Sequence, residues 1–417
     1  MSCQIRQTVD NHLCTGCGGC AGMFPESFQM LESSNAGRRP VSIGPAPKRA
    51  LGVCAGSGVD YRDLDLTTQT EQDWGPVKAT YIGHAADPDL RHKGSSGGAI
   101  SAIAAYAVEK GLVSGILHIG AAPNDALANS ARISTSRDAL LEAAGSRYAQ
   151  ASPLDGLRAL AEAPGTYGFI GKPCDVASLA KTRKAFPDYK DKLPLTISLL
   201  CAGPSNRVGV NALLDEMDVE DGATVDSLRY RGEGWPGTMQ AAYTGKDGKR
   251  KLSTALSYVT GWGKVLQKHR LWPCRICIDH VGFFADISVG DPWHQAPEGN
   301  TDKGESLIVA RTPYGQSVIE DAIREGYLVA EQVDDDALAK AQPNLLNARA
   351  SAFGRRLTMR LMGLAVPADR GTGLLGCWLR NLSPREKLSS ILGTAKRIIS
   401  QKIYRAPVPT FEGETRK

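Results

Sequence analysis

The sequence predicts an α/β protein built around a mostly parallel sheet, and three observations support this. Strand-like and helix-like segments alternate from about residue 77, residues 1–75 are rich in loops and closely spaced cysteines, and the chain beyond residue 350 is helical and basic. Alternation of this kind is typical of an open parallel sheet with helices on both faces. We expect three parts: an N-terminal module (1–75), a sheet domain (76–345) and a helical basic extension (346–417).

The individual elements follow from local patterns. Apolar, β-branched runs predict strands over 77–84, 113–120, 166–171, 193–200 and 286–290. Helices are expected over 97–110, 153–161, 175–186 and 206–216. A hairpin is expected around the turn Lys246-Asp247-Gly248.

A basic, amphipathic helix is expected near the end of the chain. Its apolar face carries Leu388, Ile391, Leu392, Ala395, Ile398, Ile399 and Ile403. Two interpretations stay open: this face packs on the body of the protein, or it contacts an anionic membrane or a partner.

Composition excludes several classes of protein. Of 417 residues, 42% are hydrophobic and 22% charged, which is typical of globular rather than disordered or fibrous chains. The most apolar stretch, 97–122, is interrupted by Glu109 and Lys110, and residues 1–14 have no apolar core of a secretion signal. We therefore expect a cytoplasmic protein.

Charge is unevenly distributed along the chain. The net charge is +5, but residues 351–417 alone carry +9, which leaves −4 for the rest. The basic character belongs to the extension, so we expect no nucleic-acid partner for the main body.

The ten cysteines point to metal binding or catalysis, because a reducing compartment disfavours disulfides. Cys14, Cys17 and Cys20 have the spacing that holds a [4Fe–4S] cluster in bacterial ferredoxin loops. Phe24 stands where such a run would continue with another cysteine, so Cys54 is the expected fourth ligand. A zinc site is the alternative.

A second group combines separate parts of the chain. Cys174 and Cys201 each follow a predicted strand, so both are expected at the carboxyl edge of the sheet, where ligands bind. Cys274 and Cys277 complete a set that predicts a second [4Fe–4S] cluster. Alternatively, Cys174 and Cys201 pack as small buried hydrophobic residues, and Cys274 and Cys277 alone form a zinc knuckle. Cys3 and Cys377 have no evident partners.

A glycine-rich loop opens the first predicted helix of the sheet domain. Small residues before a helix allow its backbone amides to approach a phosphate. The loop comprises Lys93, Gly94, Ser95, Ser96, Gly97 and Gly98. Gly232–Gly237 also matches G-x-G-x-x-G, but a strand-like segment follows it, so we reject a dinucleotide site there.

Together these segments resemble the family of the coenzyme F420-reducing hydrogenase beta subunit, whose relatives include 7-hydroxymethyl chlorophyll a reductase. The resemblance rests on the segments 14–20, 93–116, 145–153, 171–179, 230–237 and 273–293 and on the Cys201 region. It implies an iron–sulfur flavoprotein with FAD and two [4Fe–4S] clusters held by the two cysteine sets. It also implies that the Ser95–Gly98 loop, Arg147, Tyr148 and Lys172 contact the flavin or its phosphates; Arg231 is a further cationic candidate. The extension lies outside the resemblance.

The predicted activity is an oxidoreductase that passes electrons from ferredoxin or another donor through the clusters to FAD and on to a small molecule. His280 and Asp291 are candidate proton donors, although Asp291 is also a plausible turn residue. One alternative is an F420-dependent oxidoreductase or the F420- and FAD-binding subunit of a larger complex. Another is a non-catalytic electron-transfer or zinc-stabilised scaffold protein. Homo-oligomers are compatible with all three.

Overall fold

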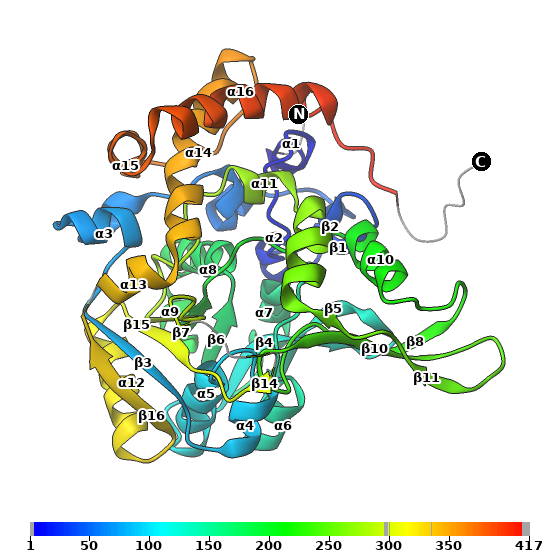
Figure 1. Ribbon diagram of the computed structural model, residues 1–417. Helices are drawn as coiled ribbons and strands as arrows, with labels where there is room; N and C mark the ends of the chain where they lie inside the picture. The colour runs from blue at the N-terminus through cyan, green and yellow to red at the C-terminus, as the bar shows by residue number, and fades with distance from the viewer. Residues whose placement is uncertain (1–3, 296–298, 300, 335, 411–417) are drawn as a thin grey trace.

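A computed structural model describes residues 4–295, 299, 301–334 and 336–410; Cys3 lies outside these residues. The molecule is organised around an eight-stranded sheet with the order β16-β3-β15-β13-β7-β6-β4-β5 (Figure 1). Its strands are β3 (Ala79–Ala85), β4 (Gly115–Ala122), β5 (Asp125–Ser134), β6 (Tyr167–Gly171), β7 (Leu195–Leu199), β13 (Ile287–Gly290), β15 (Ser306–Ala310) and β16 (Leu328–Val333).

The sheet is mixed, which corrects the prediction of a mostly parallel one. β4, β6, β7 and β13 pair in parallel, whereas the pairs β4–β5, β13–β15, β15–β3 and β3–β16 are antiparallel. The five predicted strands nevertheless all run in one direction. The antiparallel pairs arise because β5, β15 and β16, which were not predicted, run the opposite way. The carboxyl ends of the five predicted strands therefore still share one edge.

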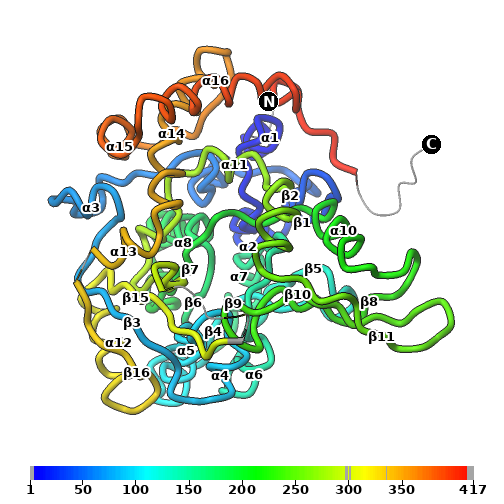
Figure 2. The backbone as a smooth tube through the Cα atoms, in the orientation of Figure 1, coloured from blue at the N-terminus to red at the C-terminus, as the bar shows by residue number. Residues whose placement is uncertain are grey.

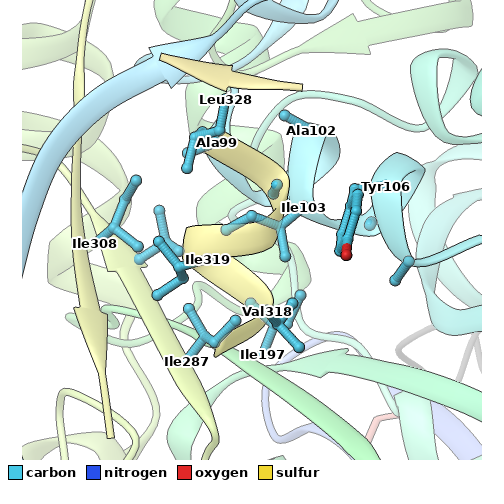
Figure 3. Packing of buried hydrophobic residues seen from close by; sticks show 14 of the residues in the cluster. Ala99, Ala102, Ile103, Tyr106, Ile197, Ile287, Ile308, Val318, Ile319 and Leu328 are labelled. Atoms are coloured by element: carbon cyan, nitrogen blue, oxygen red, sulfur yellow. The ribbon is translucent and has the colours of Figure 1, made fainter. Parts of the chain in front are cut away.

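Helices cover both faces of this sheet. On one face, α5 (Ala99–Glu109) and α12 (Pro313–Arg324) pack against strand residues such as Ile197, Ile287 and Ile308 (Figure 3). On the other face, α8 (Pro173–Ala185) contributes Val176 and Leu179 to a cluster with Leu117 and Phe169. The short helices α4 (Pro88–Lys93), α6 (Arg137–Glu142), α7 (Leu157–Leu160), α9 (Asp188–Lys192) and α10 (Arg207–Glu216) complete this part.

A smaller antiparallel sheet projects to one side of the molecule (Figure 1). It contains β8 (Thr224–Arg229), β10 (Thr238–Thr244), β11 (Arg250–Leu252) and β12 (Leu256–Ser257). The pairing of β10 with β11 confirms the predicted hairpin. Strand β10 directly follows Gly237, as the sequence predicted when Gly232–Gly237 was rejected as a dinucleotide site. A separate two-stranded ladder joins β9 (Trp235–Pro236) to β14 (Thr301–Asp302).

The N-terminal part consists of short elements. They are α1 (Gln4–Asp10), α2 (Gly19–Met23), the hairpin β1 (Phe28–Ser33) and β2 (Gly37–Ser42), three 3₁₀ turns between 48 and 63, and α3 (Gln69–Trp74). Phe24 and Phe28 pack here with Ala50 and Val53, next to α8. This part therefore rests directly on the sheet domain.

The extension wraps over the outside of the molecule. After α13 (Asp336–Ala341) at the end of the sheet domain, it comprises most of α14 (Pro343–Leu361), then α15 (Leu374–Asn381) and α16 (Pro384–Ser400), with α15 and α16 beyond α14 at the periphery (Figures 1 and 2). Ile398 and Ile403 are buried, but Leu388, Leu392 and Ile399 are exposed. The predicted apolar face is thus divided, because Ser390, Thr394 and Ile398 form the side that packs inward. Among the described residues, no helix is both long and apolar enough to cross a membrane.

Candidate functional site

A cavity of about 280 Å³ lies at the edge where β6, β7 and β13 end; we call it the edge cavity. Lys172 follows β6, Cys201 follows β7 and Asp291 follows β13, and all three line it. Open α/β sheets bind ligands at this edge because loops after parallel strands converge there. The predicted location of the site is therefore where the structure has a cavity.

The glycine-rich loop closes one end of the edge cavity. Gly94, Ser95, Ser96 and Gly98 line it together with the first turn of α5. The loop follows the short helix α4, which was not predicted although Asp87 and Pro88 form its cap and first turn. Gly98 has φ +73°, and a Cβ there would lie 2.4 Å from the Leu90 carbonyl oxygen, so the turn between α4 and α5 needs glycine. The amide end of α5 therefore faces the cavity and favours an anion.

Two serine hydroxyls fix this loop against neighbouring segments. The Ser96 and Ser306 hydroxyls are 2.8 Å apart, and the Gly97 amide donates to Ser306 Oγ at 3.0 Å. The Ser146 amide donates to Ser95 Oγ. These hydrogen bonds hold the loop in position at the cavity.

Aromatic rings form another wall of the edge cavity. Tyr148 lies against Trp262 with ring centres 4.9 Å apart, and Tyr258 stacks on Trp293 at 5.1 Å. Tyr258 directly precedes a π-helical segment, Val259–Val265, and Trp262 lies within it. This geometry is often found at functional sites. Sequence reasoning missed both residues, because Gly261 and Gly263 obscure the helical pattern there.

Arg231 and Asp291 form a buried, two-bonded ion pair beneath these rings. Arg231 Nη1 and Nη2 donate to the two carboxylate oxygens at 2.9 and 2.6 Å, and Trp235 Nε1 donates to Asp291 Oδ1 at 2.8 Å. The guanidinium of Arg231 lies 4.9 Å from the Tyr258 ring centre. The charge of Arg231 is therefore balanced within the protein, and Asp291 accepts three hydrogen bonds; its role as a proton donor stays a prediction.

Arg147 and Lys172 supply positive charge to the edge cavity. Lys172 pairs with buried Asp175 at 2.6 Å, so its charge is balanced. Arg147 bonds to Asn129 Oδ1 and to backbone carbonyls, and no carboxylate in the described part of the chain lies within ion-pair distance of it. Arg147 is thus the cavity cation best placed to bind an anionic ligand.

The second cysteine set (Cys174, Cys201, Cys274 and Cys277) gathers beside the cavity. Cys174 interacts electrostatically with Cys201 and Cys277, and Cys274 with Cys201 and Cys277. The Gly203 amide donates to Cys201 Sγ at 3.3 Å. Burial and the nearby Cys274 raise the pKa of Cys201 to about 12. Cys201 is shared between this set and the edge-cavity lining.

The first cysteine set (Cys14, Cys17, Cys20 and Cys54) is also brought together, around a small cavity of about 20 Å³. Burial and the thiols of Cys17 and Cys14 raise the pKa of Cys54 to about 12. Helix α8 holds this set: Cys17 Sγ contacts Ser178 Oγ at 3.3 Å, and Lys181 Nζ donates to the Cys54 carbonyl at 2.7 Å. Cys54 thus lies where a fourth ligand is needed.

The donor chemistry of both sets fits the predicted clusters. Each set gathers four cysteine thiols, and such thiols become thiolates most readily when a metal centre supplies positive charge. In the described residues, no group of three or more His, Cys, Asp or Glu side chains is placed to hold a single metal ion. A cubane takes one cysteine per iron and so keeps its ligands further apart than one ion does. Metal binding stays a prediction.

Among the predicted site residues other than the cysteines, three lie outside the lining of the edge cavity. Lys93 and Gly97 flank residues that line it. His280 is buried behind the second cysteine set, where its Nδ1 lies 2.9 Å from the Cys201 carbonyl oxygen and its Nε2 has no partner. Burial lowers the pKa of His280 to about 4. In the structure, His280 therefore contacts the Cys201 backbone rather than the cavity.

His118 lines the edge cavity, and its burial predicts that the stability of the protein depends on pH. Burial, with a contribution from Arg132, lowers its pKa to about 4, against about 6.5 in an unfolded chain. The folded state therefore binds fewer protons, and its stability is complete above pH 6.5 and falls by about 3 kcal/mol as the pH drops towards 4. We expect His118→Gln to lack this part of the decrease when the free energy of unfolding is measured by urea denaturation at several pH values between about 4 and 7. Identical slopes in the variant and the wild type would contradict the assignment.

Comparisons with known proteins identify the family. Residues 80–158 match the N-terminal model, and residues 165–336 the C-terminal model, of the coenzyme F420 hydrogenase/dehydrogenase beta subunit. The coenzyme F420 hydrogenase subunit beta of Methanococcus voltae is 26% identical over 70% of this chain and 99% of its own length. The F420-dependent formate dehydrogenase 1 subunit beta of Methanococcus maripaludis is 25% identical over 64% of this chain and 65% of its own length.

A solved structure supports the fold. A chain of the F420-reducing [NiFe] hydrogenase complex from Methanosarcina barkeri aligns with a TM-score of 0.50 and 16% identity, covering 82% of this chain and 98% of that one. The two family models lie on the sheet domain that carries the edge cavity, and the extension follows their last matched residue. The chain belongs to the coenzyme F420 hydrogenase/dehydrogenase beta subunit family.

Proposed function

We propose that this protein is an iron–sulfur flavoprotein oxidoreductase that carries electrons from a one-electron donor, such as ferredoxin, to a small molecule bound at the edge cavity. The observation that carries this proposal is the continuity of the two cysteine sets with the cavity. Cys17 of the first set contacts Ser178 on α8, and Cys174 of the second set lies one turn earlier on the same helix. Cys201, also of the second set, lines the cavity.

The separation between the two sets is small. Cys174 and Ser178 are four residues apart, which corresponds to about 6 Å along a helix. Asp175, between them, interacts electrostatically with both Cys17 and Cys174. Centres held by the two sets would thus lie in series, with the second set next to the cavity.

The cavity fits FAD by its chemistry. Flavin supplies the exchange between one-electron and two-electron chemistry when it is bound. The amide end of α5 and the Ser95–Gly98 loop would hold its phosphates, and Arg147 would balance their charge. The rings of Tyr148, Tyr258, Trp262 and Trp293 would exclude water from the isoalloxazine, and Lys172, paired with Asp175, would contact the flavin from the side of the second set.

Coenzyme F420 is the second candidate partner of this site. The relatives are named as beta subunits of F420 hydrogenase and of F420-dependent formate dehydrogenase. By analogy, we propose that the small molecule is F420 or a related two-electron carrier and that the chain works with a partner subunit.

The test is anaerobic purification of the full chain with assays for iron, sulfide and flavin. We expect about eight irons and one FAD per chain. Arg147→Gln is expected to weaken flavin retention about tenfold, because it removes a cavity cation that no carboxylate of the described residues neutralises, whereas exposed Arg324→Gln, the matched control, should retain flavin. A colourless protein would contradict the proposal. Turnover of added F420 would identify F420 as the small molecule, and absence of turnover would indicate a different one.

A further inference from the structure

Exposed apolar side chains are concentrated in the extension. Nine of the fifteen large hydrophobic side chains that the described residues expose lie between Leu361 and Val408. On α15, Leu375 and Leu379 are 51% and 53% exposed. On α16, Leu388, Leu392 and Ile399 are 56%, 59% and 62% exposed. This part of the chain follows the last residue matched by the family, so its surface is an addition to the family's sheet domain.

The exposed residues of α16 form a continuous stripe. At 3.6 residues per turn, Leu388, Leu392 and Ile399 project within about 40° of one another. Ser390, Thr394 and Ile398 form the opposite, buried side, which packs on α14. The stripe is therefore not the packing face of the helix. Because α15 and α16 lie outside α14 at the periphery of the molecule (Figure 1), a flat surface can reach them.

Basic side chains border this stripe. Arg385 and Lys396 follow Leu392 around the helix, and helices α15 and α16 together carry five Lys or Arg residues against one Glu. Neither Arg385 nor Lys396 forms an ion pair with a carboxylate in the described ranges of the chain, whereas Arg380 pairs with Asp73. An apolar stripe bordered by unpaired cations fits a surface that is apolar inside and negatively charged outside.

We propose that α15 and α16 bind the surface of an anionic lipid bilayer, with the Leu388–Leu392–Ile399 stripe in the acyl boundary and Arg385 and Lys396 at the headgroups. A second copy of the chain is a poorer occupant, since a two-fold interface would place two positively charged faces against each other. An in-plane helix needs no membrane span, in agreement with the helices described.

The test is co-sedimentation of the full chain with lipid vesicles, using phosphatidylcholine alone or with about one third phosphatidylglycerol. We expect binding to the anionic vesicles that weakens with salt, and at least about tenfold weaker binding to phosphatidylcholine alone. The triple variant Leu388→Gln, Leu392→Gln, Ile399→Gln should lose about tenfold or more of the binding to anionic vesicles. Its matched control replaces Ile43, Leu252 and Val329 with Gln, which are similarly exposed outside the extension.

The outcomes are distinct. Loss of binding in the α16 variant but not in the control supports the proposal, as does weaker binding of Arg385→Glu, Lys396→Glu. Absence of wild-type binding to anionic vesicles overturns it, and so does equal loss in both triple variants. A wild-type oligomer that the α16 variant dissociates, without vesicle binding, would assign the stripe to a second copy instead. Iron and flavin content should be the same in all variants, so this result is independent of the proposed redox function.

Discussion

Replacing Cys277 with serine is expected to remove about four of about eight irons per chain while the first cysteine set stays loaded. Cys277 lies close to Cys174, Cys201 and Cys274, so losing its thiolate leaves the second set with three ligands. Cys20→Ser should remove the other half and leave the second set intact. The measurement is iron and sulfide content of anaerobically purified protein, with electron paramagnetic resonance spectra of the reduced forms to distinguish the two centres.

Cys377 provides the matched control for this experiment. It is fully buried, but it packs with Ala350 and Leu382 between helices of the extension, away from both sets. Cys377→Ala should therefore lower stability slightly and leave the iron content unchanged. If Cys277→Ser kept about eight irons, or if Cys377→Ala lost iron, the assignment of the second set would be wrong.

The largest effect on stability is expected at the Arg231–Asp291 pair. The Arg231 side chain is 2% exposed, so Asp291→Ala would leave a buried guanidinium without its carboxylate. Removing one partner of a buried ion pair typically costs about 3–5 kcal/mol. Trp235 Nε1 would lose its acceptor as well. We expect a drop of this size in the apparent free energy of unfolding, measured by urea denaturation followed by tryptophan fluorescence.

A surface pair gives the comparison. Asp336 and Lys340 form an i,i+4 pair in which both side chains are about 60% exposed, and such pairs contribute less than about 1 kcal/mol. Asp336→Ala should therefore be nearly silent. A loss of similar size in both variants would contradict the expectation that burial makes the Arg231–Asp291 pair the larger contribution to stability.

The sequence was sufficient to place the strands that carry the site but not to establish the pairing of the sheet. Apolar runs marked β3, β4, β6, β7 and β13, and their common direction follows from the helical connections. β15 and β16 are similar in composition, but composition does not encode strand direction. β15 pairs antiparallel with β13, and the described residues of the link between them include no crossover helix that would return the chain parallel.

The candidate site was predictable to a similar extent. Cysteine spacing and the glycine-rich loop identified the two sets and one end of the edge cavity. The aromatic wall was missed, since Tyr258 and Trp262 depend on a π-helical segment that no simple periodicity marks. The pairing of Arg231 with Asp291 is also invisible in the sequence, because sixty residues separate them and only the fold brings them together.

Helix α8 has one more consequence. Electron tunnelling rates fall exponentially with distance, so a chain of redox centres tolerates little variation in spacing. Cys174 and the Ser178 contact to Cys17 are carried by one continuous, proline-started helix of thirteen residues. Lengthening the gap between centres at these positions would require that helix to unwind. In the proposed electron path, thermal motion of the surrounding loops would therefore leave the transfer rate almost constant, and α8 would act as a rigid spacer between the two centres.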